Sequence, residues 1–129
     1  MKDPAYEAGL AVRRRILGEA HVRRSLENAT TFDGEFQDLV TRHAWGDVWT
    51  RPGLDHRTRS LITIALLAAG GHQEVLKLHV RATRNASVTS DEVKEVLLQV
   101  AVYAGVPAAN SAFRIAKSAF EEMAKEDAR

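Results

Sequence analysis

The chain has 129 residues, a formal net charge of +1 and no cysteine, and 45% of its residues are hydrophobic. We therefore expect a single domain, residues 1–129, with a hydrophobic core, and we exclude disulfides, thiolate metal sites and thiol catalysis. The longest apolar run covers only residues 61–69, no signal core follows Met1, and basic residues are interspersed with acidic ones, so we expect a cytoplasmic protein with no membrane or nucleic-acid partner.

Two helices are predicted in the first part of the chain. Asp3 followed by Pro4 is a helix start, because Asp caps free amides and proline's missing donor does no harm in the first turn. This helix is expected to run to about Leu26. Asp33 opens the second helix. Four positions of the second helix share one face by their spacing: Phe36, Leu39, Val40 and His43.

A break is predicted at residues 50–54, because Pro52-Gly53 is a turn pair and the residue before proline is pushed out of helical geometry. The third helix, about residues 56–69, is apolar on nearly every side after Ser60. This pattern is typical of a helix in the centre of a bundle or at a subunit interface. Gly70-Gly71 ends it.

The rest of the chain predicts three more helices. One runs from about His72 to Asn85, and the next begins at a capping box formed by residues 89–92. The last starts at Pro107 after Gly105. Its expected buried stripe comprises Phe113, Ala116, Phe120 and Met123. No alternating strand pattern appears, so the expected fold class is all-α, a compact bundle of about six helices.

Histidines are the first candidates for chemistry. His72 and His79 are seven residues apart, about 10.5 Å along a helix axis, which is too far to chelate one ion. We expect no metal site. His79 follows apolar neighbours, and a partly buried imidazole there can act as general acid or base near neutral pH. A core histidine satisfied by a structural partner fits the pattern equally well, and His43 has the same two interpretations.

Arginines and aromatic residues are the second group of candidates. Arg51 lies in the Pro-Gly break, and a guanidinium at a pocket mouth can pair with both oxygens of a carboxylate. For Arg51, as for Arg57 and Arg59, an ion pair with a carboxylate such as Glu74 is the alternative. Trp45 and Tyr103 can line a pocket, although aromatic residues at helical spacing are usually core.

Three segments together carry a resemblance to a known family: residues 57–65 (RTRSLITIA), 74–79 (EVLKLH) and 100–110 (VAVYAGVPAAN). With the Trp45–Trp49 segment, the chain resembles the carboxymuconolactone decarboxylase family. The resemblance implies an all-helical, alkyl hydroperoxidase D-like fold and a homo-oligomer, a trimer or hexamer. The peroxidase branch of this fold carries Cys-x-x-Cys-x-x-x-His. Matching its histidine to His79 puts His72 and Val75 at the cysteine positions, which excludes the thiol-dependent route.

Decarboxylation is what the resemblance then implies, with a small carboxylated lactone as substrate and no cofactor. The electrons left by carbon dioxide can flow through a conjugated double bond into the lactone carbonyl, so the substrate is its own electron sink. On this hypothesis His79 is the general acid, with His72 as second candidate, and Arg51 anchors the retained carboxylate. Trp45 and Tyr103 form the walls. The alternatives are a relative acting on another lactone or carbonyl compound, and a binding protein without turnover.

Overall fold

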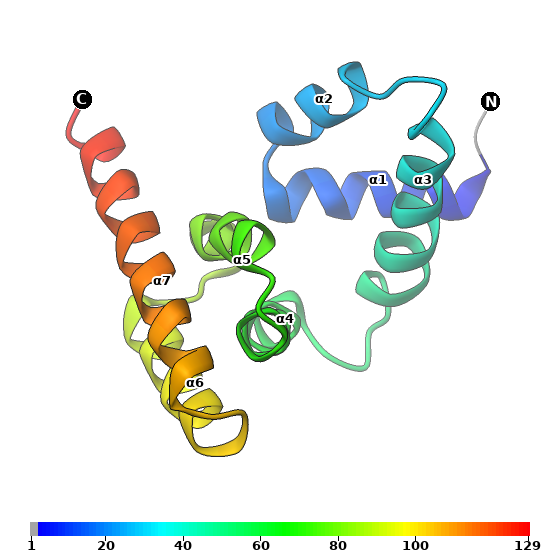
Figure 1. Ribbon diagram of the computed structural model, residues 1–129. Helices are drawn as coiled ribbons and strands as arrows, with labels where there is room; N and C mark the ends of the chain where they lie inside the picture. The colour runs from blue at the N-terminus through cyan, green and yellow to red at the C-terminus, as the bar shows by residue number, and fades with distance from the viewer. Residues whose placement is uncertain (1–2) are drawn as a thin grey trace. The chain divides into compact units, whose positions relative to one another are not determined.

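Every regular element of the described chain is a helix, which confirms the all-α fold class. The computed structural model describes residues 3–129, and this range contains seven α-helices, one π-helix and one 3-10 helix, with no strand (Figure 1). Backbone contacts divide the chain into two compact units, which meet in sequence between His56 and Arg57. No helix within residues 3–129 combines the length and the apolar character needed to cross a membrane.

The N-terminal unit begins with two helices where the sequence predicted one. Helix α1 (Pro4–Leu17) starts as expected, because the Asp3 carboxylate accepts a hydrogen bond from the backbone amide of Tyr6 at 2.9 Å. The predicted continuation to Leu26 is wrong. Gly18 has φ 95°, a conformation that glycine adopts without strain, so the chain turns there and α2 (Glu19–Glu27) begins. A small core joins both helices: Tyr6, Leu10 and Val22, flanked by Leu17 and Leu26.

The second predicted helix is present, but its last ten residues are a π-helix. Helix α3 (Gly34–Leu39) continues into η1 (Val40–Trp49), and the predicted break follows at Thr50. The face that is buried is not the one that the apolar spacing marked. Phe36 and Leu39 are exposed, whereas Thr41, Trp45 and Trp49 are buried.

Helices α1 and η1 touch through their backbones at two glycines. A Cβ on Gly9 would meet the backbone of Thr41 and Gly46, and one on Gly46 would meet the carbonyl of Ala5. Beside this crossing, the buried Arg13 guanidinium donates hydrogen bonds of 3.0 Å to Thr41 Oγ1 and to Gln37 Oε1. Burial lowers the pKa of Arg13. The close approach of α1 and η1 therefore depends on two glycines, and the buried Arg13 cation links the two helices beside it.

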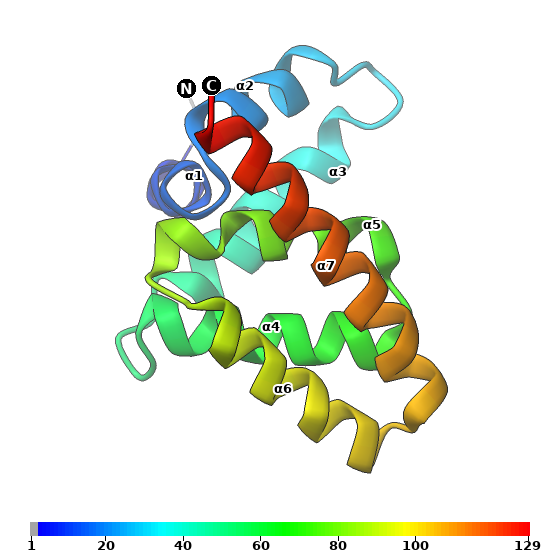
Figure 2. The ribbon, with the colours of Figure 1, turned by 90° about the vertical axis from the view of Figure 1, so that its left-hand side faces the viewer.

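The C-terminal unit contains α4 (His56–Gly70), α5 (Gln73–Arg81), the 3-10 helix η2 (Ala82–Ala86), α6 (Ser90–Tyr103) and α7 (Val106–Asp127). Helices α5 and α6 both pack on α7 (Figure 2). The predicted capping box is confirmed: the Thr89 side chain accepts from the amide of Glu92 at 3.2 Å, and the Glu92 carboxylate accepts from the amide of Thr89 at 2.9 Å.

Ion pairs along α7 hold α5 in place. Lys77 lies 2.7 Å from the Glu122 carboxylate, and Arg81 donates to Glu126 at 2.6 Å. The Lys77 hydrogen bond is the main cause of a lowered pKa at Glu122. Ala116 of the predicted α7 stripe is buried, as expected. The other buried residues of α7 are small ones that were not predicted: Ala109, Ala112 and Ala119. Phe113, Phe120 and Met123 are only partly buried.

Candidate functional site

His79 is a buried polar residue of the C-terminal unit. It lies in the last turn of α5, on the same face as Leu76 and Val80, and only 6% of it is exposed. The ion pairs of Lys77 and Arg81 with α7 flank it along the helix. An imidazole in this position is shielded from bulk water, and an imidazole can donate or accept a proton.

His72 is placed differently from the prediction. The helix was expected to include it, but α5 begins at Gln73, and His72 has φ −85° and ψ 75° at the capping position. Its exposed ring folds back on the preceding turn, where a Cβ on Gly70 would lie 2.8 Å from His72 Cδ2. His72 and His79 therefore do not share one helical face. A cavity of about 70 Å³ beside His72 has room for a water molecule or two but not for a lactone dicarboxylate.

Arg51 and Trp45 both belong to the N-terminal unit. Arg51 is exposed in the turn after η1, and its backbone amide donates to the carbonyl of Val48 at 3.1 Å. Trp45 is 5% exposed and stacks on Trp49, with ring centroids 4.8 Å apart. Trp49 also faces His56, at 6.1 Å between centroids. The exposed Arg51 can reach a soluble anion, whereas the Trp45 ring is mostly covered by its own unit.

Tyr103 ends α6 and is 80% exposed. It borders a shallow apolar hollow of about 480 Å³ between α4 and α6, which also includes Leu66 and Gln99. The hollow is open to solvent on one side, and the role of Tyr103 as a wall of the substrate pocket stays a prediction.

The other candidates have structural partners. Arg57 forms an ion pair with Glu92 on α6, so the expected type of interaction is present but Glu74 is not the partner. His43 is exposed and lies 2.8 Å from the Asp47 carboxylate, one turn along η1. Its interpretation as a core histidine or a proton donor in a pocket is not supported by this exposure.

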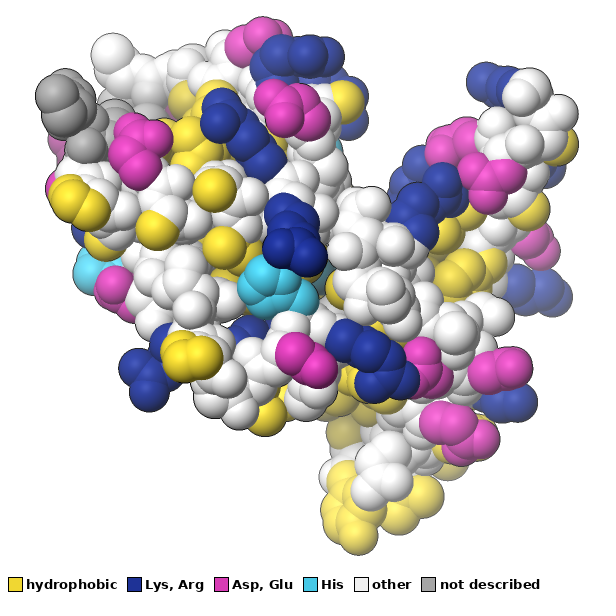
Figure 3. Space-filling model, turned by 180° about the vertical axis from the view of Figure 1, so that it is seen from behind, with side chains coloured by type: hydrophobic (Ala, Val, Ile, Leu, Met, Phe, Trp, Pro, Cys, Tyr) yellow, Lys and Arg dark blue, Asp and Glu magenta, His cyan; other side chains and the backbone are white. Residues whose placement is uncertain are grey.

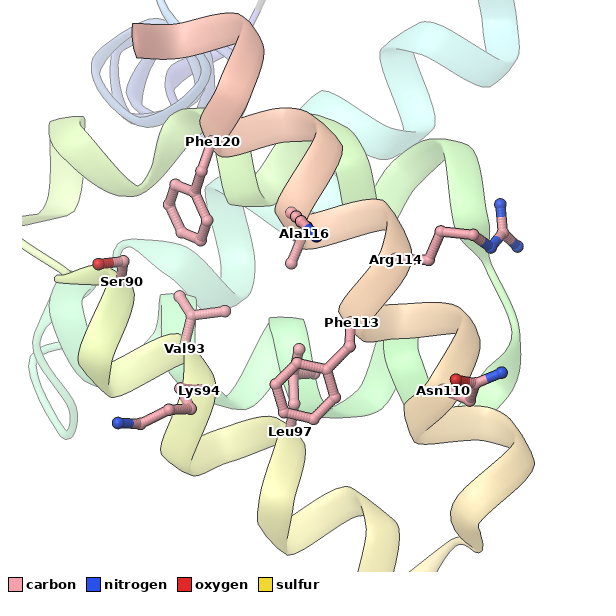
Figure 4. A pocket seen from close by; sticks show the side chains of 10 residues that line it. Ser90, Val93, Lys94, Leu97, Asn110, Phe113, Arg114, Ala116 and Phe120 are labelled. Atoms are coloured by element: carbon pink, nitrogen blue, oxygen red, sulfur yellow. The ribbon is translucent and has the colours of Figure 1, made fainter.

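A second cavity, of about 510 Å³, was missed by sequence reasoning. It lies between α6 and α7, and Phe113 and Phe120 point toward it from α7 while Val93 and Leu97 do so from α6 (Figure 4). The cations Lys94, Arg114 and Lys117 also border it. The half-buried aromatic residues of α7 were the available signal. No imidazole or carboxyl group lines this cavity, so it lacks a group that donates protons near neutral pH.

Together these positions define a helical protein with a shielded imidazole in one unit and an exposed guanidinium in the other. Within residues 3–129, no three His, Asp or Glu side chains gather as a metal-binding group. The chemistry that these side chains offer is anion binding and proton transfer.

Comparison with known proteins identifies the family. The sequence profile of the carboxymuconolactone decarboxylase family matches residues 34–118. This chain belongs to that family, and the resemblance seen in the sequence is confirmed.

Two relatives match over most of the chain. A 4-carboxymuconolactone decarboxylase of Acinetobacter baylyi is 50% identical over 121 residues, which cover 94% of this chain and 90% of the relative. A nitrosuccinic acid decarboxylase of Metarhizium robertsii is 39% identical over 118 residues, covering 92% of this chain and 82% of the relative. A 4-carboxymuconolactone decarboxylase of Pseudomonas putida is 60% identical over 42 residues, 33% of this chain and 88% of the relative.

Proposed function

We propose that this chain is a carboxy-lyase that converts 4-carboxymuconolactone into 3-oxoadipate enol-lactone during the degradation of aromatic compounds. The observation that carries the proposal is the 50% identity, over 94% of the chain, with the Acinetobacter baylyi enzyme of that activity. We further propose that residues 1–129 act as one catalytic domain, in the cytoplasm, within a homo-oligomer of three or six copies.

The substrate supplies the electron sink for this reaction. The bond between the ring carbon and its carboxylate breaks, carbon dioxide leaves, and the electron pair moves through the ring double bond to the lactone carbonyl. A proton then adds to the carbon beside that carbonyl, which restores the carbonyl and leaves the enol-lactone. One proton is consumed in each turnover. The protein must bind a dianion, stabilise the enolate oxygen and deliver the proton.

We assign the proton delivery to His79. Its low exposure keeps water from competing for the enolate, and an imidazole can both donate and accept a proton. His72, which is exposed, is the second candidate. Arg51 is the proposed anchor of the retained carboxylate, since its guanidinium can form two parallel hydrogen bonds. Tyr103 and Trp45 are the proposed walls of the substrate pocket. Trp45 is mostly buried.

The decisive experiment follows the ultraviolet absorbance of the conjugated lactone on mixing with the purified protein. The absorbance should fall with the wild type, and carbon dioxide should appear in equal amount. For His79→Gln we expect a loss of about 10²–10⁴ in kcat, the usual contribution of a general acid. His43→Gln is the matched control, because that histidine is exposed. Full turnover by His79→Gln would eliminate the assignment.

The anchor is tested separately. Arg51→Ala should raise KM roughly 10- to 100-fold, because a charge-assisted hydrogen bond contributes about 1.5–3 kcal/mol. Arg23→Ala, another exposed arginine of the same unit, is the control. An unchanged KM in Arg51→Ala would remove Arg51 from the site.

A second substrate is favoured by the 39% identity with the nitrosuccinic acid decarboxylase. Nitrosuccinate also has two carboxylates, one of which sits on a carbon whose electrons can enter an acceptor, here the nitro group. The same anion-binding and proton-delivering groups serve both reactions. Comparing kcat/KM for the two compounds decides between them, and turnover of neither compound by a folded protein would favour a binding protein.

A further inference from the structure

The outer face of α4 is apolar and exposed in the C-terminal unit. Only Ser60, Ile64 and Ala68 of this helix are buried. Ile62 and Leu66 on the opposite side are exposed, and Leu66 is 66% exposed. A helix that is apolar on nearly every side is normally covered on nearly every side.

The end of α6 and the start of α7 continue this surface. Val102 is 76% exposed, Tyr103 80% and Val106 69%. The hollow between α4 and α6 joins Leu66 directly to Tyr103. Figure 3 shows hydrophobic side chains gathered at the end of the molecule where Figure 1 places the turn between α6 and α7. We call this surface the α4–α6 face; its members are Ile62, Ala65, Leu66, Ala69, Val102, Tyr103 and Val106.

Charge is absent from the sequence that builds this face. Residues 60–73 contain no Asp, Glu, Lys or Arg, and neither do residues 96–113. Depletion of charge is the compositional mark of the core of a protein interface, and permanent homo-oligomers show it most strongly. The exposed parts of the large side chains offer roughly 600 Å² of apolar surface, near the ~800 Å² per partner of a standard interface.

The shape of the face suits a second copy of the same chain. Leu66 and Tyr103 protrude, whereas the small side chains of Ala65, Ala69 and Ala104 line the hollow beside them. A surface that carries both a protrusion and a hollow can complement itself about a two-fold axis. A second copy is also the partner that is present in equal amount whenever the chain is made.

We infer that the α4–α6 face is the principal self-association surface of this protein, and that a second copy covers it. This inference rests on the proposed homo-oligomer but not on the proposed reaction. Association through this face buries Leu66 and Val102 and places Tyr103, a proposed wall of the substrate site, at the boundary between the two copies. It depends little on salt, because residues 60–73 and 96–113 supply no charged side chain to it.

Single cysteines test the burial, since the chain has no cysteine of its own. Val102→Cys is a near-isosteric change, and Phe32→Cys, at a 96% exposed apolar position of the N-terminal unit, is the control. In the native assembly we expect alkylation of the cysteine at 102 to be at least tenfold slower than that at 32, and equal after unfolding. Equal native rates would overturn the inference.

Mass measurement by light scattering tests the association itself. Leu66→Glu should yield a smaller species than the wild type at the same concentration, with unchanged helical circular dichroism, whereas Phe32→Glu should not. The wild-type mass should stay the same between low and high salt. A monomeric wild type, or a Leu66→Glu assembly of wild-type mass, would refute the inference. If Leu66→Glu fails to fold, the alkylation rates of Val102→Cys and Phe32→Cys test the inference without it.

Neither the alkylation rate of the single cysteines nor the mass from light scattering depends on catalytic turnover. A protein that assembles through this face but leaves the lactone unchanged would contradict the proposed function alone. A protein that turns over the lactone as a monomer would contradict the self-association surface and the proposed homo-oligomer, but not the proposed reaction.

Discussion

Replacing Gly9 by alanine tests whether backbone contact between α1 and η1 sets the stability of the N-terminal unit. The new Cβ would collide with the carbonyl oxygen of Thr41 and would lie 2.6 Å from the nitrogen of Gly46 and 2.9 Å from its Cα. All three atoms belong to the backbone of η1, so no side-chain rotation relieves the overlap. The two helices must move apart, and the packing between them is loosened.

The expected loss follows from two opposing effects. Overpacking costs about 1–3 kcal/mol, and a collision with three backbone atoms belongs at the upper end of that range. Alanine stabilises the helix by about 1 kcal/mol relative to glycine. The net decrease in the free energy of unfolding is therefore about 2 kcal/mol, which corresponds to a Tm lower by roughly 8 °C for a chain of this size.

Thermal and urea unfolding, followed by far-ultraviolet circular dichroism, measure this loss. Gly34→Ala is the matched control, because Gly34 is also helical and no atom lies within 4 Å of its Cβ position. We expect that control to be at least as stable as the wild type, with a gain of up to about 1 kcal/mol. Equal midpoints for Gly9→Ala and Gly34→Ala would refute the reasoning.

Three further perturbations act on a cap and on two titrating groups. Thr89→Ala removes half of the capping box and should cost about 1 kcal/mol in urea unfolding, whereas Thr89→Ser should cost little. The hydrogen bond from the Tyr6 amide lowers the pKa of Asp3 from 3.8, so the ionised carboxylate stabilises the fold above that pH. The wild type should therefore have a higher Tm than Asp3→Asn at neutral pH, and this difference should disappear below about pH 4. A difference in Tm that does not change with pH would contradict this. Burial lowers the pKa of His21 from 6.5, aided by Arg13, so the wild type should lose stability as pH falls from about 7. His21→Gln should decline less steeply in urea midpoint, and parallel declines would speak against the assignment.

Much of the helix pattern was predictable because helix ends are local. The Asp3-Pro4 start, the break at Pro52-Gly53 and the capping box at Thr89 each depend on residues a few positions apart. Gly18 was the local signal that the prediction passed over. Its positive φ divides the first helix, and a glycine within a helical pattern has two outcomes that spacing alone does not distinguish.

The sequence indicated which residue types are candidates for the site, but it did not predict the surroundings of each side chain. The sequence singled out His79, and the structure buries it, whereas His43, for which the structural interpretation was favoured more strongly, is exposed beside Asp47. Arg57 was expected to pair with an acid, and its partner Glu92 is 35 residues away on another helix. Which carboxylate an arginine meets depends on how helices pack, and this is not encoded in their spacing.

The sequence by itself determined the helical class, most helix ends, the absence of thiol chemistry and the family, because each depends on composition or on short-range pattern. Tertiary structure alone decided which face of a helix is buried. The face of η1 that carries Trp45 and Trp49 packs inward although Phe36 and Leu39 mark another face, and α7 buries alanines in place of Phe113 and Phe120. The physical reason is that close helix packing selects side chains by the space between two backbones, which no single helix specifies.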